Sequence, residues 1–175
     1  METHRLVPHP NFAPGEVKDV SVRWADVPGG RVMLRYMVDG AGSLVVPPFQ
    51  GRGRGDDLWK TTCFELFLYD GEGRYREFNF SPSGQWAAYA FSAYRQPDGN
   101  YEPKQIPEIK HEQGESLFVL TVFLDKRDLG EAELAGLAAV IEEQGGRPSY
   151  WALAHNELQP DFHTPSSFKL ALGGK

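Results

Sequence analysis

Short runs in which apolar and polar residues alternate, separated by turn residues, recur along most of this chain. Within residues 20–38, two alternating runs flank the sequence Pro28-Gly29-Gly30. Alternation with a period of two is the pattern of a strand with one buried face, and a glycine-rich turn between two such runs predicts a hairpin. The 19 glycines, 13 prolines and 13% aromatic residues also suit many short strands joined by turns. The sequence therefore predicts an all-β protein.

Two later segments extend this prediction. The segment "SLFVLTVFLD", residues 116–125, is a strong strand candidate. Residues 131–144 have a composition for which propensity alone predicts a helix. However, the Gly-Gly turn that follows leads into the aromatic run "SYWALAH", so we expect residues 131–144 to form the preceding arm of a hairpin. The chain closes with "FHTPSSFKLAL", which is predicted to be a loop followed by a short strand.

Length, charge and cysteine content limit the possible functions. With 175 residues, no internal repeat and no low-complexity linker, residues 1–175 are expected to form one domain, with an irregular N-terminal segment over residues 1–17. A net charge of −6 argues against a nucleic-acid partner, which requires a clustered basic surface. The only cysteine, Cys63, excludes a disulfide framework and is expected to pack as a small apolar side chain. No apolar window has the length of a membrane span and the start lacks a signal-like apolar region, so we expect a cytoplasmic protein without a membrane partner.

One carboxylate, Glu65, interrupts the most strand-like run of the chain, residues 59–69. The apolar residues that share one face are Phe64, Leu66 and Leu68 in this run, and Phe78 and Phe80 in the run that follows. A register that joins these two sets places Glu65 opposite Asn79, because a slip of one residue would place Glu65 against phenylalanine. Glu65 and Glu77 then become diagonal neighbours on the second face.

The position of Trp86 depends on the next connection. If "SPSG" is a four-residue loop, Trp86 lies opposite Asn79, and the second face carries two carboxylates, an amide and an indole. If the loop differs by one residue, Trp86 moves to the core. An antiparallel sheet commonly exposes one face to water, which would make Glu65 and Glu77 simply solvated residues. The apolar neighbours on this face, Cys63, Phe67 and Tyr69, argue against that interpretation.

The segments "WKTTCFELFLYD", "EFNFSPSG" and "FHTPSSFKLAL" together resemble the DOMON-like superfamily, in particular the family 9 carbohydrate-binding modules and their stand-alone bacterial relatives. The resemblance covers residues from about 20 to the C-terminus. It implies a β-sandwich of jelly-roll type. In that family a tryptophan stands six positions before a glutamate of the central strand, as Trp59 does before Glu65, although the acidic residue often found between them is Thr62 here.

The resemblance also implies roles for particular residues. The family's C-terminal pattern corresponds to Phe162, His163, Thr164, Pro165 and Phe168. In sugar-binding members the aromatic residue of this pattern and the early tryptophan sandwich a sugar ring, which implies Trp59 and Phe162 as a stacking pair. This chain has phenylalanine where those members use tryptophan, and asparagine at position 79 where they place a basic residue. Their structural calcium has no matching ligand set here, so we expect no metal and no cofactor.

The leading hypothesis is a non-catalytic module that binds a small polar ligand, such as a carbohydrate, on an aromatic and carboxylate-lined sheet face. Aromatic rings would supply stacking area, and polar groups would hydrogen-bond the hydroxyls. The predicted ligand-binding residues are Trp59, Glu65, Glu77, Asn79, Trp86, Phe162 and His163.

Three alternatives stay open. Two carboxylates in one cleft are what glycoside hydrolysis requires, so Glu65 and Glu77 could instead serve a hydrolase. The same face, or an open sheet edge, could bind another protein as a scaffold. Other DOMON-like domains bind haem through a methionine and a histidine or lysine; Met33 or Met37 could act with His155 or His163, although hairpin methionines more often fill apolar space. No feature of the sequence indicates an oligomeric state.

Two further motifs are assigned structural roles. His155, Asp161 and His163 are residue types that ligate zinc, but neither the short helical histidine spacing nor a cysteine pair accompanies them, so we expect local hydrogen bonds instead. The segment "GRGRGDD" lacks the full spacing of a dinucleotide-binding turn and precedes a strand rather than a helix. It is predicted to be a mobile loop, from which Arg52 and Arg54 could close over an anionic ligand.

Overall fold

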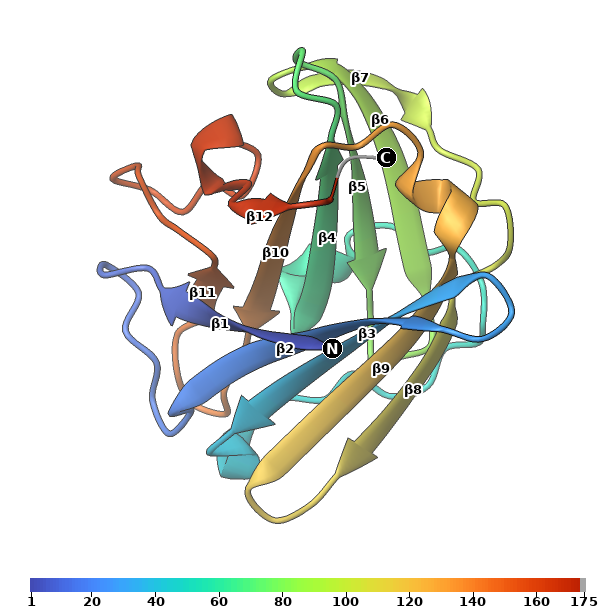
Figure 1. Ribbon diagram of the computed structural model, residues 1–175. Coiled ribbons are helices and arrows are strands. Elements are labelled where there is room, and N and C mark those ends of the chain that lie inside the picture. The colour runs from blue at the N-terminus through green and yellow to red at the C-terminus, as the bar shows by residue number, and fades with distance from the viewer. Residues whose placement is uncertain (174–175) are drawn as a thin grey trace.

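The computed structural model describes residues 1–173, and in this part of the chain it contains twelve strands, all paired antiparallel, and four short 3-10 helices (Figure 1). The strands are β1 (Glu2–Pro8), β2 (Asp19–Val27), β3 (Arg31–Asp39), β4 (Cys63–Tyr69), β5 (Tyr75–Phe80), β6 (Trp86–Ala93), β7 (Gln96–Asn100), β8 (Glu108–Gln113), β9 (Leu117–Asp125), β10 (Leu134–Ile141), β11 (Ser149–Ala152) and β12 (Leu170–Ala171). The 3-10 helices are η1 (Ala41–Ser43), η2 (Leu58–Lys60), η3 (Lys126–Leu129) and η4 (Pro165–Ser167). The predicted all-β class is confirmed.

The strands form two layers that are joined by β1. One layer has the order β2-β3-β9-β8, and the other has the order β7-β6-β5-β4-β10-β11, with β12 also paired to β10. The first five residues of β1 pair with β2, and its last two, Val7 and Pro8, pair with β11. One strand that passes between layers is a usual way to close the corner of a sandwich. The predicted β-sandwich is confirmed.

The expectation that residues 1–17 are irregular is wrong for Glu2–Pro8, which form β1. Only Leu6 of this strand is buried. A strand with one buried side chain has almost no alternation of apolar and polar residues, so its sequence does not predict a strand. Pairing with the neighbouring strands determines its conformation instead.

The core lies between the two layers and contains the inward-facing side chains of both. Phe64 of β4 stacks against Phe118 of β9 with ring centroids 5.9 Å apart. The hydroxyl of Tyr36 crosses the core and donates to the backbone oxygen of Glu65 at 2.9 Å. This bond satisfies a buried polar group that would otherwise cost stability. It also ties β3 to the strand that carries Glu65.

The other sequence-based strand predictions agree with the structure. The hairpin predicted in residues 20–38 is β2 and β3, and the segment at 116–125 contains β9. Residues 134–141 form β10, which is buried on both faces between β4 and β11. A strand in that position buries apolar residues continuously, so tertiary packing overrides the helix propensity of this segment.

The register between β4 and β5 is the predicted one, with Glu65 opposite Asn79. The placement of Trp86 on the second face is wrong, because the loop after β5 has five residues, Ser81–Gln85, rather than four. Ala87 therefore lies opposite Asn79, and Trp86 points into the core, where it is 6% exposed. With a period of two, one extra loop residue moves every later side chain of the strand to the other face.

Arg54 fixes the glycine-rich loop before η2. Its guanidinium lies 4.5 Å from the Trp86 ring and donates to the backbone oxygens of Ala88 and Tyr101. Backbone hydrogen bonds also join Gly53 and Gly55 to Trp86. Arg54 is thus used to pack this loop onto β6 and is not directed at a ligand.

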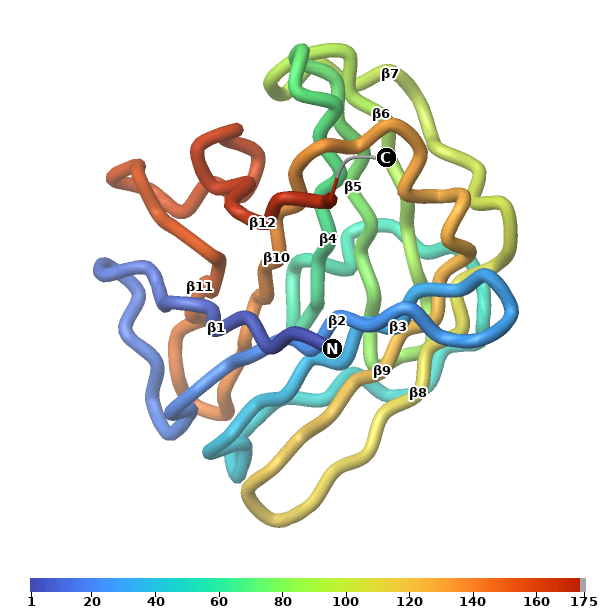
Figure 2. The backbone as a smooth tube through the Cα atoms, in the orientation of Figure 1, coloured from blue at the N-terminus to red at the C-terminus, as the bar shows by residue number. Residues whose placement is uncertain are grey.

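The N-terminal segment and the loop after β11 lie side by side (Figure 2). The ring of His9 is 1% exposed; its Nδ1 accepts from the Asn11 backbone N–H, so its Nε2–H donates to the backbone oxygen of Glu157 at 2.9 Å. His155 Nε2 lies 2.8 Å from the backbone oxygen of Val7. Residues 9–12 and 155–163 therefore support each other along the outer face of the β4–β5 layer.

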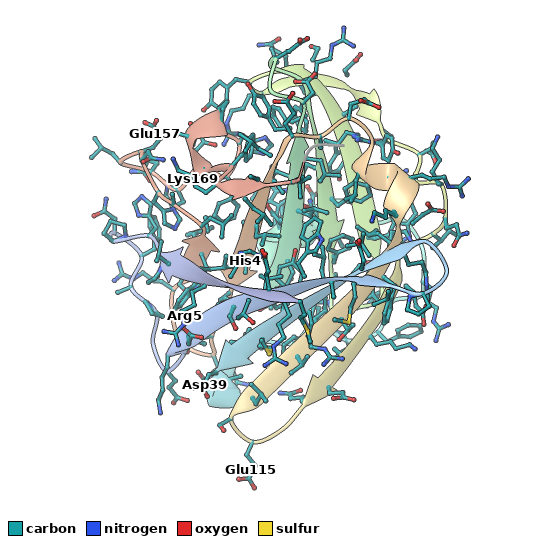
Figure 3. The ribbon with its side chains drawn as sticks, in the orientation of Figure 1. His4, Arg5, Asp39, Glu115, Glu157 and Lys169 are labelled. Carbon is teal, nitrogen blue, oxygen red and sulfur yellow. The ribbon has the colours of Figure 1, made fainter. Side chains whose placement is uncertain are left out.

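Charged side chains such as Arg5, Asp39, Glu115 and Lys169 project outward at the periphery (Figure 3). Glu143, in contrast, is 4% exposed and accepts hydrogen bonds from the backbone N–H groups of three consecutive residues, 15–17. It holds the segment before β2 against the end of β10. The described residues include no helix with the length and apolar character needed to cross a bilayer.

Candidate functional site

The outer face of the β4–β5 layer is not a solvated surface. Glu65 is 3% exposed and Glu77 is 6% exposed, and Phe67 and Cys63 on the same face are fully buried. The interpretation of these glutamates as solvated residues is therefore wrong. Cys63 packs as a small apolar side chain, as predicted, against Leu58 and Ala87.

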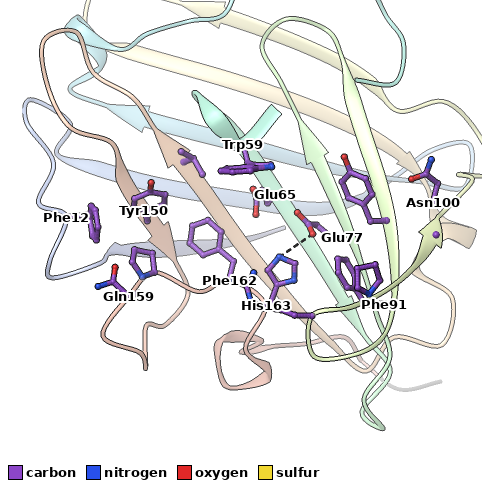
Figure 4. Close-up of a pocket in the computed structure, with 16 residues that line it drawn as sticks. Phe12, Trp59, Glu65, Glu77, Phe91, Asn100, Tyr150, Gln159, Phe162 and His163 are labelled. Carbon is purple, nitrogen blue, oxygen red and sulfur yellow. Dashed lines mark ion pairs between the residues drawn. The ribbon is translucent and has the colours of Figure 1, made fainter. Parts of the chain in front are cut away.

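Four parts of the chain cover this face: the segment with Phe12, η2 with Trp59, residues 95–100 and residues 159–163. Between them lies a large pocket, which we call the aromatic pocket. Its volume is about 790 Å³. Its lining comprises Phe12, Trp59, Glu65, Glu77, Tyr89, Phe91, Arg95, Pro97, Gly99, Asn100, Val140, Tyr150, Gln159, Pro160, Phe162 and His163. Figure 4 shows Trp59 and Phe162 on two sides of the space, with Glu65 close to them and Glu77 further along, beside His163. The size falls within the range of roughly 300–1,000 Å³ that is common for small-molecule sites.

Trp59 and Phe162 reach the aromatic pocket from two different covering segments. Trp59 belongs to η2, which packs over β4 and β5, and its side chain is 51% exposed. Phe162 precedes η4, whose Ser167 hydroxyl donates to the Phe162 backbone oxygen at 3.1 Å. Behind η4, Phe168 stacks on Phe67 at 5.6 Å and lies directly over Gly136, where a Cβ atom would be 2.6 Å from its ring. Gly136 thus lets the C-terminal segment lie close to the sheet.

The two non-glycine residues with left-handed backbone in residues 1–173 both flank the aromatic pocket. Asp57, with φ 58°, precedes η2 and so orients Trp59, and Arg95, with φ 51°, lies in the turn between β6 and β7. Such conformations cost about 1–3 kcal/mol each and persist where surrounding contacts impose them. Their position indicates that surrounding contacts hold the walls of the aromatic pocket in a fixed conformation.

The two buried carboxyl groups interact electrostatically. Burial raises the pKa of Glu65 well above its ordinary value, and the charge of Glu77 raises it further. Burial also raises the pKa of Glu77 to about 7, against the opposing effects of the Asn79 amide and the Arg95 charge. Two carboxylates in a poorly hydrated place resist simultaneous ionisation. The pair therefore loses its protons at higher pH than ordinary glutamates do.

His163 contacts this pair as a neutral ring. Its Nε2 lies 3.4 Å from Glu77 Oε2, the dashed contact in Figure 4. Burial, with a further contribution from the charge of Arg95, lowers the pKa of His163 to about 4. The Tyr75 hydroxyl accepts from the Arg95 backbone N–H and lies 2.8 Å from His163 Nδ1. The Tyr75 O–H is free to donate to Nδ1, and in the tautomer that accepts this bond the ring proton is on Nε2, on the side of Glu77.

Arg95 borders the aromatic pocket, but its charge is already paired. Its guanidinium donates to Asp161 Oδ1 at 2.9 Å, and Asp161 also accepts from the Tyr94 hydroxyl. The Asp161 carboxylate further accepts from the His163 backbone N–H at 3.0 Å. Asp161 is therefore a structural residue that fixes the loop carrying Phe162 and His163, rather than a metal ligand.

The structure separates the predicted site residues into three groups. Those that line the aromatic pocket are Trp59, Glu65, Glu77, Phe162 and His163. Asn79 lies on the pocket side of β5 but is 1% exposed beneath η2, and neither atom of its amide makes a hydrogen bond of normal geometry. Trp86 belongs to the core on the other side of the sheet.

Several pocket residues were missed by the sequence-based prediction, among them Phe12, Tyr89, Phe91, Arg95 and Tyr150. Tyr89 and Phe91 would have been placed correctly with a five-residue loop after β5, because they share the face of Ala87. Phe12 and Arg95 belong to irregular segments and carry no periodic signal.

Two alternative ligand sets do not come together. Met33 and Met37 flank the core-facing Leu34 and Tyr36 on β3, so they point to the outer face of the other sheet, away from His163. A haem held by His163 would not reach them. Within residues 1–173 no group of three or more histidine, cysteine, aspartate or glutamate side chains is arranged to hold a metal ion.

These features describe a β-sandwich with an aromatic, acidic pocket on the outer face of one sheet. No protein-family model matches the chain, and no curated protein is detectably similar in sequence. Its structure is similar to the crystal structure of a candidate carbohydrate-binding protein from Bacteroides uniformis ATCC 8492, with a TM-score of 0.67. The match covers 95% of this chain and 84% of that chain, with 18% sequence identity. A likeness at this identity establishes a shared fold.

Proposed function

We propose that this protein is a carbohydrate-binding module of the DOMON-like, family 9 type that holds a sugar ring in the aromatic pocket. The observation behind the proposal is that two aromatic side chains, Trp59 and Phe162, border the aromatic pocket. Its floor, on the side of the sheet, presents the carboxyl groups of Glu65 and Glu77. A sugar ring has apolar faces that stack on aromatic rings and equatorial hydroxyls that require hydrogen-bond partners. The fold shared with a candidate carbohydrate-binding protein supports the same assignment.

Each polar group in the aromatic pocket would have a defined role in this function. Glu65 and Glu77 accept hydrogen bonds from hydroxyls, and ionised acceptors make stronger bonds than neutral ones. His163 Nδ1 lies 2.8 Å from the Tyr75 hydroxyl and its Nε2 lies 3.4 Å from Glu77, so the ring would help to orient this carboxyl toward the ligand. Trp59 is half exposed without ligand, so a stacked ring would remove apolar surface from water.

Calorimetric titration with a panel of mono- and oligosaccharides at millimolar concentrations tests this proposal. We expect saturable binding that Trp59→Ala weakens at least tenfold, because about 1.4 kcal/mol of stacking energy is lost. Phe49→Ala is the matched control, since Phe49 is 69% exposed and lies outside the aromatic pocket. Absence of heat with every sugar, or unchanged affinity in Trp59→Ala, would contradict the proposal.

One observation favours a second candidate function, glycoside hydrolysis. A carboxyl with its pKa raised to about 7 beside a second carboxyl has the properties of a general acid. Incubation with aryl glycosides of different stereochemistry should then release the aryl group, and Glu77→Gln should reduce turnover at least a hundredfold while sugar binding persists. If the wild-type protein releases no product with any of these substrates, the catalytic alternative fails and the binding function is unaffected.

A further inference from the structure

The floor of the aromatic pocket has two buried carboxyl groups, and among the described residues no lysine or arginine is paired with either of them. Arg95 is paired with Asp161, and Lys60 pairs with Asp57 on the outside of η2. His163, which contacts Glu77, is a neutral ring at pH 7. Carboxylates this deeply buried are normally paired with a cation or a metal ion.

The same floor has unfilled hydrogen-bond acceptors. Within residues 1–173, no hydrogen bond or ion pair is formed by the Glu65 side chain. Its cross-strand neighbour Asn79 is buried, and its amide lies near enough to Glu77 to lower the pKa of that carboxyl but makes no hydrogen bond of normal geometry. Among the described residues, the Glu77 carboxylate approaches a basic side chain only at His163, at 3.4 Å. Hydroxyl groups of a ligand could fill these acceptors, but they would not favour the ionised form of either carboxyl group as a cation does.

The walls of the aromatic pocket also favour a cation. The rings that surround the floor are Phe12, Trp59, Tyr89, Phe91, Tyr150 and Phe162. The face of an aromatic ring carries negative potential and attracts an ammonium group. An ammonium group offers three N–H donors and one positive charge, so it can satisfy two carboxylates where a hydroxyl satisfies one acceptor.

Resting on the proposed sugar-binding function, we propose that the preferred ligand is an amino sugar whose protonated amine is held by Glu65 and Glu77. The sugar ring then stacks between Trp59 and Phe162, and the ammonium group supplies the positive charge that the floor of the aromatic pocket lacks.

This arrangement links binding to proton release. A cation placed between Glu65 and Glu77 favours their ionised forms, so protons that the pair holds because of its raised pKa values leave when the amine binds. The other titratable or charged groups around the pair are Cys63 on β4, Tyr75 on β5, Tyr89 on β6, and Arg95, Asp161 and His163 in the covering segments. Of these, His163 is already neutral and Arg95 stays charged, so the carboxyl pair is the source of the proton.

The experiment compares three matched sugars by calorimetry at pH 7: a neutral hexose, its 2-amino-2-deoxy form and the N-acetylated amine, in the gluco, galacto and manno series. In at least one series we expect the free amine to bind ten times more tightly than the other two. Titrations in two buffers of different ionisation enthalpy should show net proton release for the amine alone.

Glu65→Gln should reduce the amine preference to less than threefold and reduce proton release to that of Glu77 alone. Glu72→Gln, which makes the same change in the exposed turn between β4 and β5, should keep both. If the neutral hexoses bind as tightly as the amines, the amine proposal is overturned and the carbohydrate-binding function stands. If neither neutral nor amino sugars bind, the proposed function fails, and the inference fails with it.

Discussion

Replacing Glu143 with alanine is expected to destabilise the protein by about 3–5 kcal/mol, on the basis of ~1 kcal/mol for each of the four hydrogen bonds that its carboxylate accepts. The Glu143 carboxylate accepts from the backbone N–H groups of Gly15, Glu16 and Val17 at 2.7, 2.7 and 3.1 Å, and from the Ser43 hydroxyl at 3.1 Å. Alanine leaves these donors without a partner and leaves a gap where the side chain was. Urea unfolding followed by tryptophan fluorescence measures the loss.

Two further variants separate the role of Glu143 from a general effect of charge. Glu143→Gln keeps the oxygen that faces Glu16 and Val17 but places an NH₂ group against the Gly15 N–H, so about 1–2 kcal/mol should be lost. Glu142→Ala removes the neighbouring carboxylate, which makes none of these bonds, and should change stability by less than about 0.5 kcal/mol. Equal losses of unfolding free energy in Glu142→Ala and Glu143→Ala would show that the hydrogen bonds from residues 15–17 to Glu143 do not stabilise the fold.

The double variant Glu65→Gln, Glu77→Gln is expected to become more stable than the wild type as the pH rises from 5 to 8. In the folded state the pKa of Glu77 is raised to about 7 and that of Glu65 is raised well above its ordinary value, whereas both groups return to about 4.3 on unfolding. Across this window the unfolded wild-type chain has lost protons that the folded protein keeps. The favourable contribution of the protonated pair, fully present below about pH 4.3, is therefore lost as the pH rises.

The expected size of this effect is about 3 kcal/mol for Glu77 alone, at ~1.4 kcal/mol per pKa unit. Wild-type stability by itself would not reveal it, because burial lowers the pKa of His155 and His163 and these groups contribute the opposite slope below pH 6.5. Subtracting the variant's unfolding free energy from that of the wild type removes the histidine contribution. A difference that stays constant from pH 5 to 8, as expected for the exposed control Glu72→Gln, would show that the pair is not shifted.

The register that places Glu65 beside Glu77 could be predicted because its signals are local. Strong alternation marks both strands, and the Asp70 carboxylate closes the turn between them by accepting from the backbone N–H groups of residues 72–74. The opposite case is Trp86, whose position depends on whether a loop has four or five residues. Sequence patterns rarely distinguish those lengths, and with a period of two a single residue decides which face a side chain occupies.

The walls of the aromatic pocket could not be predicted in this way. Phe12 and Phe162 lie at opposite ends of the chain and line the same pocket because His9 and Asn11 bond to the backbone of residues 157 and 158. Neither segment is periodic, and β1, which positions the first of them, has only one buried side chain. Contacts of this kind follow from how the two layers close, rather than from any local preference.

The sequence by itself determined the all-β class, the pairing of β4 with β5 and the presence of two carboxylates on one face, because alternation and turn chemistry act over a few residues. Only the tertiary structure decided that this face is covered, that Trp59 and Phe162 border one pocket, and that the pKa values of Glu65 and Glu77 are raised. The physical reason is that desolvation raises the pKa of a carboxyl, and here the atoms that exclude water come from segments far apart in the chain.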